Sequence, residues 1–370
     1  MKIEAKTLLA ALKRASIPTS DKAYLPIQRS LRLRSQTDLL VIQSTSLDVE
    51  ACISLKVPGS VDAPDAIVNA KESLRIVALM EGTLDVSLTP EALLLVSGRH
   101  RVSIPATPLE GKDWPRIEFE TGQNAVDVDL SLPALQRALR LVDHARDGNG
   151  TRPNLVYICL DLQSDTCRAV ATDGMRLASA KVADLSTVAP HQILLPPHIV
   201  RAINDAKGAR AVITTRLQPS SDPQDTPQGH TLTLDGEFWS WCASQNAYPH
   251  YTNVIPQASP PVRIACGSQI VSALKLALKM REGNRGVHIA NVGAEASLTL
   301  PDTSGTLQAL HETFPNTATG NEDLRVYLNP QYLADALAVL PESTLEMIDP
   351  LSPVTLRKGD DFALLMPMRY

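Results

Sequence analysis

Cysteine is scarce in this 370-residue chain, and its cysteines form no recognisable site. The five residues are odd in number and scattered, without a Cys-x-x-Cys pair or a paired histidine spacing. This pattern indicates neither a disulfide framework nor a zinc site. We therefore expect five reduced, mostly buried thiols, no metal and no cofactor.

Long apolar runs are also missing. No window approaches the roughly 20 apolar residues that a membrane helix needs. The N-terminal residues lack the basic stretch and apolar core of a signal peptide. We expect a cytoplasmic protein with no membrane partner.

The sequence offers little for catalysis. Its eight histidines are unclustered, and it contains no G-x-S-x-G, P-loop or G-x-G-x-x-G motif. Asp173, which stands in a conspicuous Asp-Gly pair, falls on an expected turn and not beside a base or nucleophile. We predict that the protein is not an enzyme.

What the chain does contain is enough apolar residues for two or three folded domains. Hydrophobic residues make up 44% of the sequence, aromatic residues only 4%, and there are 27 prolines and 18 glycines. This composition is typical of many short strands and turns packed through aliphatic side chains.

One pattern of strands and helices recurs three times. First helices are expected over 7–16, after an N-cap at Ser131 and after an N-cap at Ser268. Second helices begin near residues 71, 198 and 330, so the pattern has a period of about 130 residues. Such a period indicates complete domains and not short solenoid repeats. We place the three domains at 1–124, 125–258 and 259–370.

Short strands are expected between the helices. They include one over 92–104, and two over 155–162 and 167–171 that lead into the turn at Asp173-Gly174. The irregular stretch 218–229 is rich in Pro, Ser, Asp and Gln, which predicts a solvated hairpin loop.

The net charge of −5 hides a basic pattern. Three segments around the first helices, 6–22, 133–152 and 270–285, hold twelve basic and four acidic residues, so the remainder carries −13. On any one helix, Lys and Arg are the ordinary solvated face of an amphipathic helix. Their recurrence in every repeat, without interleaved aromatics, favours phosphate contacts that carry no sequence information. The side chains expected to make these contacts are Lys13, Lys22, Arg137, Arg140, Arg146, Arg152, Lys275, Lys279 and Arg281.

Two stretches carry a more specific signal. Ala171-Thr172-Asp173-Gly174-Met175-Arg176-Leu177-Ala178 predicts a tight turn between two strands, which by itself is a plain hairpin. The chain ends on the apolar stretch Leu364-Leu365-Met366-Pro367-Met368-Arg369-Tyr370. Together they resemble the bacterial DNA polymerase III beta subunit, the sliding clamp, whose members carry a TDGHRLA-like turn and end in MPMR plus an apolar residue. Shorter matches follow the family's order at 25–27, 97–101, 114–115, 247–249, 285–287, 329–333 and 350–354.

The resemblance implies an α+β chain of three repeated DNA-clamp domains, each with two helices packed on antiparallel sheets, forming half of a closed ring. Two chains then join head to tail as a homodimer that encircles double-stranded DNA without reading its sequence. Such a ring tethers the replicative polymerase and other DNA-processing proteins for processivity. Its partners are DNA polymerase subunits, the clamp loader and other proteins that carry a short clamp-binding peptide.

Members of the family bind that peptide in an apolar pocket between the second and third domains. Aliphatic and Met side chains suit such a site, although Leu155, Leu177 and Leu364 are each equally consistent with interdomain core. Arg176 and Arg369 are expected to bind polar groups of the peptide. Carried over by position, the pocket consists of Leu155, Thr172, Gly174, Met175, Arg176, Leu177, Pro249, Val254, Asn329, Tyr332, Leu351, Pro353, Leu364, Met366, Pro367, Met368 and Arg369.

Three positions depart from the family's pattern. Met175 replaces the usual His of the turn, Asn253 replaces a frequent Arg, and Tyr370 replaces an aliphatic last residue. These changes leave the pocket in place. They do not indicate which peptide the pocket prefers.

For the dimer contact, the resemblance points to Arg99, Arg101 and Val102 in the first domain and to Leu278 in the third. The facing stretch 298–314 offers only Asp302 and Glu312 as acidic partners. The ring is therefore held more by apolar contacts near Leu278, or it is weaker.

Two other interpretations stay open. One is a divergent clamp paralogue that serves a repair polymerase or regulates partner peptides and does not replicate the chromosome, which the changes at Met175 and Tyr370 motivate. The other is a monomeric β-rich interaction scaffold that never encircles DNA, and the mass in solution discriminates it from a ring.

Overall fold

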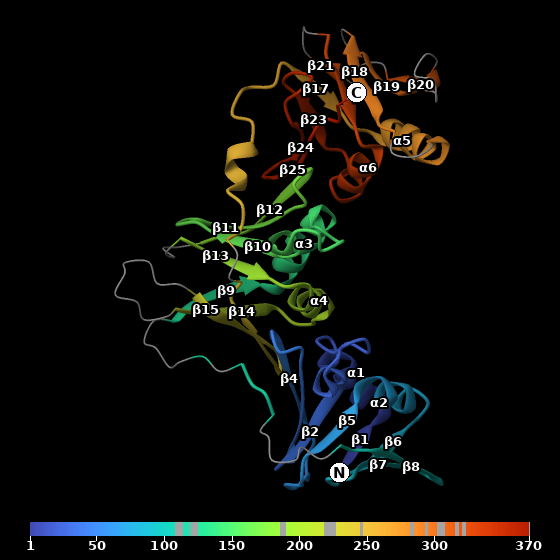
Figure 1. Ribbon diagram of the computed structural model, residues 1–370, viewed down its shortest axis with the longest axis vertical. Helices are drawn as coiled ribbons and strands as arrows, with labels where there is room; N and C mark the ends of the chain where they lie inside the picture. The colour runs from blue at the N-terminus through green and yellow to red at the C-terminus, as the bar shows by residue number, and fades with distance from the viewer. Residues whose placement is uncertain are drawn as a thin grey trace. The chain divides into compact units, whose positions relative to one another are not determined.

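The fold consists of two compact units. The first comprises Met1–Pro133 and Pro197–Gln245, and the second Ala134–Pro196 and Asn246–Tyr370 (Figure 1). The structure, a computed structural model, describes residues 1–107, 114–117, 119, 125–185, 190–217, 227–244, 247–281, 285–292, 295–301, 308–314, 318–319 and 323–369.

The order of elements repeats three times along the chain. Each repeat runs strand, helix, four strands, helix and three strands, and the third repeat adds only the short β21 (Ala318–Thr319). In every repeat the strands pair in the same two antiparallel arrays, in the orders first-sixth-seventh-eighth and fifth-second-third-fourth. The three-fold α+β repeat predicted from the helix spacing is therefore confirmed. The domain boundaries at 124/125 and 258/259 stay predictions.

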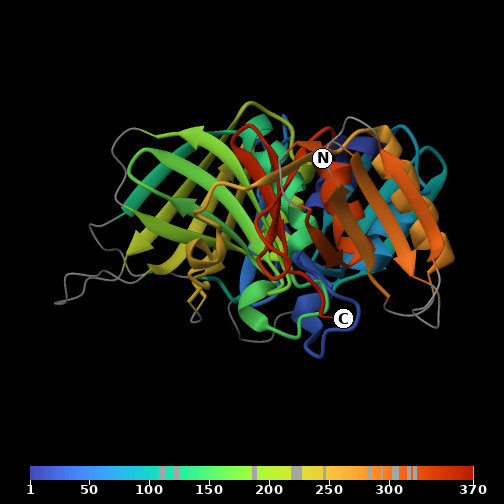
Figure 2. The ribbon, with the colours of Figure 1, turned by 90° about the horizontal axis from the view of Figure 1, so that it is seen from above.

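The first unit contains an eight-stranded and a four-stranded antiparallel sheet. The larger sheet joins the first repeat to part of the second, because β4 pairs with β16 from Val49↔Trp241 to Ile53↔Glu237. Helices α1 and α2 lie side by side (Figures 1 and 2). In spatial order the strands are β5 (Ala66–Asn69), β2 (Ser30–Gln36), β3 (Leu39–Thr45), β4 (Val49–Lys56), β16 (Glu237–Cys242), β15 (Pro227–Leu234), β14 (Arg210–Leu217) and β9 (Ala125–Ser131), then β1 (Lys2–Glu4), β6 (Thr83–Leu88), β7 (Ala92–Ser97) and β8 (His100–Pro105); the helices are α1 (Ala5–Ala15), η1 (Pro26–Arg29), α2 (Ala70–Val77) and α4 (Pro197–Asp205).

The second unit is built in the same way. Its nine-stranded sheet joins the second repeat to the third, because β12 pairs with β25 from Arg176↔Leu365 to Ser179↔Phe362. Helices α5 and α6 lie side by side, and α5 packs on β19 and β20 (Figure 2). In spatial order the strands are β13 (His191–Leu195), β10 (Ile158–Leu162), β11 (Thr166–Thr172), β12 (Arg176–Asp184), β25 (Asp361–Leu365), β24 (Val354–Lys358), β23 (Thr344–Met347), β17 (Val262–Ala265) and β21, then β20 (Gln308–Phe314), β19 (Glu295–Pro301), β18 (Val287–Val292) and β22 (Arg325–Leu328); the helices are α3 (Leu132–Val142), which begins in the last residues of the first unit, η2 (Asp143–Ala145), η3 (Pro153–Leu155), η4 (Tyr251–Val254), α5 (Ser268–Met280) and α6 (Pro330–Val339).

The helices follow from their sequences. In α1 the spacing of Leu8 and Leu12 places both on one face, and both are fully buried. In α6 the side-chain oxygen of Asn329 accepts a hydrogen bond from the Gln331 amide at 2.9 Å, and Pro330 follows the cap. In the part of the chain that the structure describes, no helix is both long and apolar enough to cross a membrane.

Several local predictions differ from the structure. The strand expected over 92–104 is the hairpin of β7 and β8, because Gly98, at φ +56°, turns the chain. Ser268 is the first residue of α5, and Gly267 occupies the N-cap without a side-chain cap. Leu155 belongs to η3, so β10 begins only at Ile158. The loop expected over 218–229 lies outside the described residues up to 226, and 227–229 belong to β15.

Candidate functional site

The turn at 172–176 joins β11 to β12 as the sequence predicts. Gly174 has φ +87°, the left-handed region that glycine adopts without steric cost. Thr172 Oγ1 accepts from the Gly174 amide at 3.1 Å and donates to the Arg176 carbonyl at 2.7 Å. Asp173 Oδ1 accepts from the Met175 and Arg176 amides at 2.8 and 3.0 Å. Side chains within the turn therefore satisfy its backbone and fix its shape.

A cavity of about 220 Å³ opens beside this turn, within the second unit. Five segments far apart in sequence form it: the region of η3, the turn with β12, the stretch that ends in η4, the residue before β24, and the end of β25. Its lining is Arg152, Leu155, Thr172, Gly174, Arg176, Leu177, Pro249, His250, Tyr251, Val254, Pro353, Leu364 and Met366.

The floor of the cavity continues into a buried cluster. Leu177 and Leu364 are 3% and 2% exposed and occupy paired positions on β12 and β25. Both belong to one apolar cluster with Tyr248 and Tyr251. Leu177 and Leu364 therefore belong to the buried core and also line the cavity. The two interpretations that the sequence left open for them, core and pocket, are both compatible with the structure.

Arg176 is engaged on all sides. Its Nε donates to Asp173 Oδ2 at 2.9 Å and its Nη1 to Asp335 Oδ2 at 2.7 Å. The guanidinium lies over the ring of Tyr332, 4.3 Å from the ring centroid. The side chain is only 13% exposed. With two carboxylates and a ring already around it, Arg176 shapes the cavity wall and has little capacity left for a ligand.

Arg152 is the exposed cation of the cavity. Its Nη1 lies 3.4 Å from the Asp173 carbonyl oxygen, which is a weak bond. A Cβ added at Gly174 would lie 2.0 Å from the same Nη1. The positive φ therefore requires glycine at position 174, and a side chain there would also displace the exposed end of Arg152.

The other residues expected in the pocket do not line this cavity. Asn329 is the N-cap of α6 and Tyr332 stacks on Arg176. Met175 and Leu351 are 51% and 81% exposed on the surface. Pro367, Met368 and Arg369 follow β25, where the Met368 amide donates to the Tyr327 carbonyl at 2.7 Å. Tyr370 lies outside the described residues.

Three residues of the lining are absent from the expected pocket. Arg152 is instead among the side chains expected to face DNA, and His250 and Tyr251 are not among the expected residues at all. The sequence signal for the last two is their place directly after Tyr248-Pro249, a pair that resembles Trp114-Pro115 at the preceding junction.

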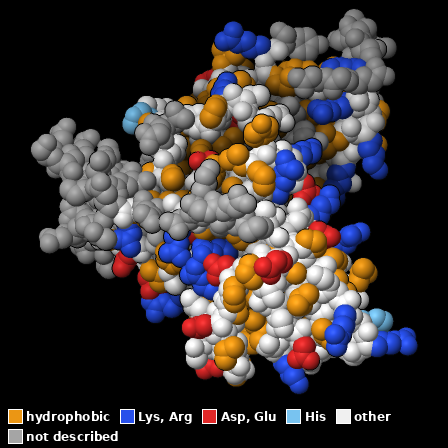
Figure 3. Space-filling model, turned by 60° about the horizontal axis from the view of Figure 1, so that its bottom comes forward, with side chains coloured by type: hydrophobic (Ala, Val, Ile, Leu, Met, Phe, Trp, Pro, Cys, Tyr) orange, Lys and Arg blue, Asp and Glu red, His pale blue; other side chains and the backbone are white. Residues whose placement is uncertain are grey.

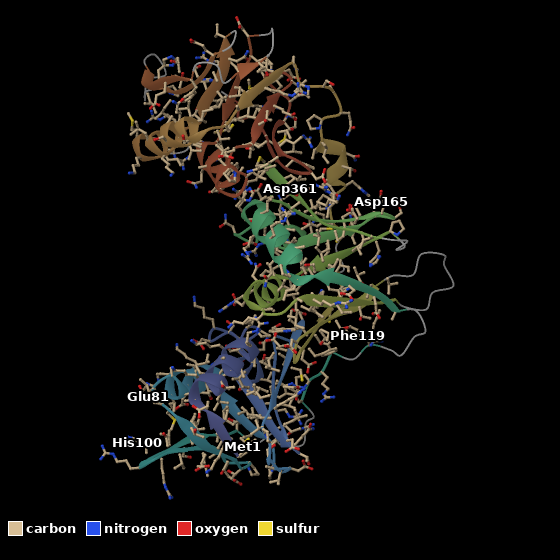
Figure 4. The ribbon with its side chains drawn as sticks, turned by 180° about the vertical axis from the view of Figure 1, so that it is seen from behind. Met1, Glu81, His100, Phe119, Asp165 and Asp361 are labelled. Carbon is tan, nitrogen blue, oxygen red and sulfur yellow. The ribbon has the colours of Figure 1, made fainter. Side chains whose placement is uncertain are left out.

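The basic residues expected to face DNA fall into two groups. Lys13, Lys22, Arg140, Lys275 and Lys279 are exposed, and the half-buried Arg281 follows α5 directly. Arg137 pairs with Asp361 at 2.6 Å, and Arg146 with Asp143 at 2.8 Å; Asp361 stands at the start of β25 (Figure 4). These two pairs neutralise part of the positive charge that the sequence assigns to α3 and its continuation.

The hairpin of β7 and β8 carries the residues expected at the dimer contact. Arg101 and Val102 lie on β8, the outermost strand of its four-stranded sheet, and Arg99 lies in the turn before it. A groove of about 450 Å³ beside them is lined by Ile76, Leu79, Met80, Glu81, Ser97, His100 and Val102. Leu79 is 81% exposed. Glu81 and His100 lie toward the same end of the first unit (Figure 4), and Figure 3 shows hydrophobic side chains interspersed with charged ones on one face of the protein.

The thiols are suited to packing and not to chemistry. Burial raises the pKa of Cys167 and of Cys266 to about 12 and raises that of Cys159 as well. These thiols therefore stay protonated near neutral pH. All five cysteines are free, and three of them are buried, as expected. Among the described residues, no three His, Cys, Asp or Glu side chains are grouped to hold a metal ion.

Comparisons with known proteins agree over the full chain. No family model matches. The beta sliding clamp of Vibrio cholerae is 24% identical over 380 residues, which are 99% of each chain. The DNA polymerase III subunit beta of Pseudomonas aeruginosa superposes with a TM-score of 0.86 at 20% identity, over 100% of both chains. A sliding clamp of the same organism bound to griselimycin gives a TM-score of 0.87 at 20% identity over 100% of this chain and 99% of that one.

Three repeats of one topology and this full-length superposition define the class: the chain has the DNA sliding-clamp fold. Within that class the chain is similar over its whole length to the bacterial beta sliding clamp, the DNA polymerase III beta subunit.

Proposed function

We propose that this chain is a DNA sliding clamp, a homodimeric ring that encircles duplex DNA and tethers the replicative polymerase and other DNA-processing proteins. The observation that carries the proposal is the clamp topology, repeated three times over the whole chain, together with an apolar cavity where the second repeat joins the third. The proposed role is topological, so the chain needs no catalytic residues of its own.

Exposed Lys and Arg on the first helix of each repeat support loose contact with DNA. Lys13 lies on α1, Arg140 on α3, and Lys275 and Lys279 on α5, and all four are exposed. Phosphate contacts of this kind are independent of base sequence and weaken with salt. They hold the ring near the duplex axis while leaving it free to slide.

The edge strands support a head-to-tail dimer. In the part of the chain that the structure describes, β8 and β20 are each the last strand of a four-stranded sheet. An exposed edge can pair with a strand of another chain. We propose that β8 of one protomer pairs with β20 of its partner, with Arg101 facing Glu312 and with Leu276 and Met280 of α5 entering the groove beside Leu79. The other acidic candidate, Asp302, lies outside the described residues.

The cavity beside the 172–176 turn supports docking of a partner peptide. Aliphatic walls from Leu155, Leu177 and Val254 suit an aliphatic side chain, and the exposed Arg152 offers a charge for a carboxylate of the peptide. We expect DNA polymerase subunits, the clamp loader and other proteins to compete for this cavity through short peptides.

A mass measurement followed by DNA retention tests the proposal. Light scattering across a dilution series should give about 80 kDa, twice the 40.0 kDa of one chain. After loading by a clamp loader, the protein should stay on closed circular duplex and leave the same DNA once it is cut to a linear form. A 40 kDa species at micromolar concentration, with no retention on circles, would leave only the monomeric scaffold.

A second candidate is a paralogue that serves a repair polymerase. The exposed Met175 and Asn253 at the turn and on η4 favour it, because they alter the surroundings of the cavity. Processivity assays with the replicative and the repair polymerase of the same cell decide between the two.

A further inference from the structure

The side of the cavity that η4 forms is fixed by a hydrogen bond to a buried residue. Tyr251 begins η4 and lines the cavity, and its hydroxyl donates to Asp161 Oδ2 at 2.5 Å. Asp161 lies on β10, away from the cavity lining, and is 4% exposed. We propose that Asp161 is a positioning residue of the pocket, which acts through Tyr251 to hold Pro249 and Val254 where an aliphatic side chain of a partner enters. This inference rests on the peptide-binding role proposed above.

The carboxylate of Asp161 is itself rigidly held. Its Oδ1 accepts from Gln163 Nε2 at 3.0 Å and lies 3.4 Å from Gln192 Nε2 on β13. Strand β10 pairs on both sides, with β11 and with β13. A buried hydroxyl without an acceptor is destabilised, because it has lost its hydrogen bonds to water. The Tyr251 side chain therefore strongly favours the position in which its hydroxyl reaches Asp161.

The segment 247–255 depends on such anchors. Its backbone hydrogen bonds are local: the Tyr251 amide donates to the Pro249 carbonyl at 2.7 Å, and the Ile255 amide donates to the Thr252 carbonyl at 3.3 Å. Val254 is 47% exposed, so packing alone fixes it poorly. The two hydroxyls that reach the sheet belong to Tyr251 and to Tyr248, whose hydroxyl donates to the Val170 carbonyl at 3.3 Å.

These two tyrosines provide a matched pair of variants. Both are at most 7% exposed and both belong to the same apolar cluster. Only Tyr251 lines the cavity as well. Replacing either by Phe keeps the ring and its packing and removes a single hydroxyl, so a difference between the variants reports the Asp161 bond and not the core.

The test measures peptide affinity by fluorescence anisotropy on the full chain. The probe is a fluorescein-labelled pentapeptide that carries two leucines, with the alanine version as its control. Tyr251→Phe should weaken binding about tenfold, the value of one hydrogen bond to a charged acceptor, and Tyr248→Phe by less than about twofold. Asp161→Asn, which keeps an acceptor oxygen, should retain most of the affinity that Asp161→Leu loses.

Amide hydrogen exchange without peptide gives an independent readout. The amides of residues 250–255 should exchange faster in Tyr251→Phe than in Tyr248→Phe, with β10 and β11 unchanged. Wild-type affinity in Tyr251→Phe, or equal losses in both variants, would overturn the proposal. If the wild-type chain binds no leucine peptide, the peptide-binding role fails, and unchanged exchange over 250–255 would then overturn the positioning role separately.

Discussion

Arg176 Nη1 donates to Asp335 Oδ2 at 2.7 Å and so ties β12 of the second repeat to α6 of the third. The same guanidinium also binds Asp173 in the adjacent turn. One side chain thus fixes both the turn and the joint between two repeats.

Replacing Arg176 by Ala should therefore damage the joint and the cavity together. The change leaves Asp173 and Asp335 without their cation, and we expect a loss of about 1–3 kcal/mol in the free energy of unfolding. Urea titration measures it, with Arg263→Ala as a control, because Arg263 is 51% exposed and pairs with Glu346 at 3.4 Å. Equal effects of the two substitutions would contradict the role assigned to Arg176.

Gly174→Ala and Gly359→Ala should cost similar amounts of stability, and only the first should affect the cavity. Both glycines have positive φ, +87° and +60°, so both variants are strained. At Gly359 a new Cβ meets nothing within 4 Å, whereas at Gly174 it meets Arg152. We expect about 1 kcal/mol of backbone strain in each variant, because the exposed end of the Arg152 side chain can move away from the new Cβ. Peptide affinity should fall only in Gly174→Ala, because the displaced Arg152 side chain lines the cavity.

Stability should fall on mild acidification. Burial, and next the charge of Arg176, lower the pKa of His144 in the folded state. The unfolded chain, with an ordinary histidine pKa of about 6.5, then binds more protons, so stability is lost as the pH falls through about 6.5 toward the folded pKa. His144→Gln should reduce the slope of the urea midpoint between about pH 7 and pH 5. It should not abolish the slope, because the pKa values of His198 and His288 are lowered too.

Charge reversal at the β8 edge should separate the proposed dimer. Arg101→Glu places an acid opposite Glu312 of the partner in the proposed pairing, and we expect at least about tenfold weaker association. Adding Glu312→Arg in the same chain restores opposite charges and should restore the dimer. Sedimentation at several concentrations measures both. A dimer unaffected by Arg101→Glu would place the interface elsewhere.

The sequence predicts elements whose signal is local. The helices at α1, α2 and α4 and the Asp173-Gly174 turn follow from apolar spacing and from the backbone freedom of glycine. The hairpin at Gly98 is missed because an apolar run on both sides of one glycine has the pattern of a single strand.

Pairings between distant residues are beyond such reasoning. Arg176 meets Asp335 across 159 residues, so the same side chain that is expected to bind a peptide also connects β12 to α6. Arg152 illustrates the same limit, since its sequence neighbours suggest DNA contact while the fold brings it to Gly174. Asp161 carries no sequence signal at all, because its role depends on Tyr251, 90 residues away.

The pairing of β12 with β25 makes the two leucines of the cavity floor neighbours across a seam between repeats. A peptide bound there, as proposed above, would contact both sides of this pairing between repeats. Linkage is reciprocal, so strain that separates β12 from β25 would weaken peptide binding, and a bound peptide would stabilise the strand pairing by the same free energy. The fraction of chains with a bound peptide would then depend on how firmly β12 and β25 are paired.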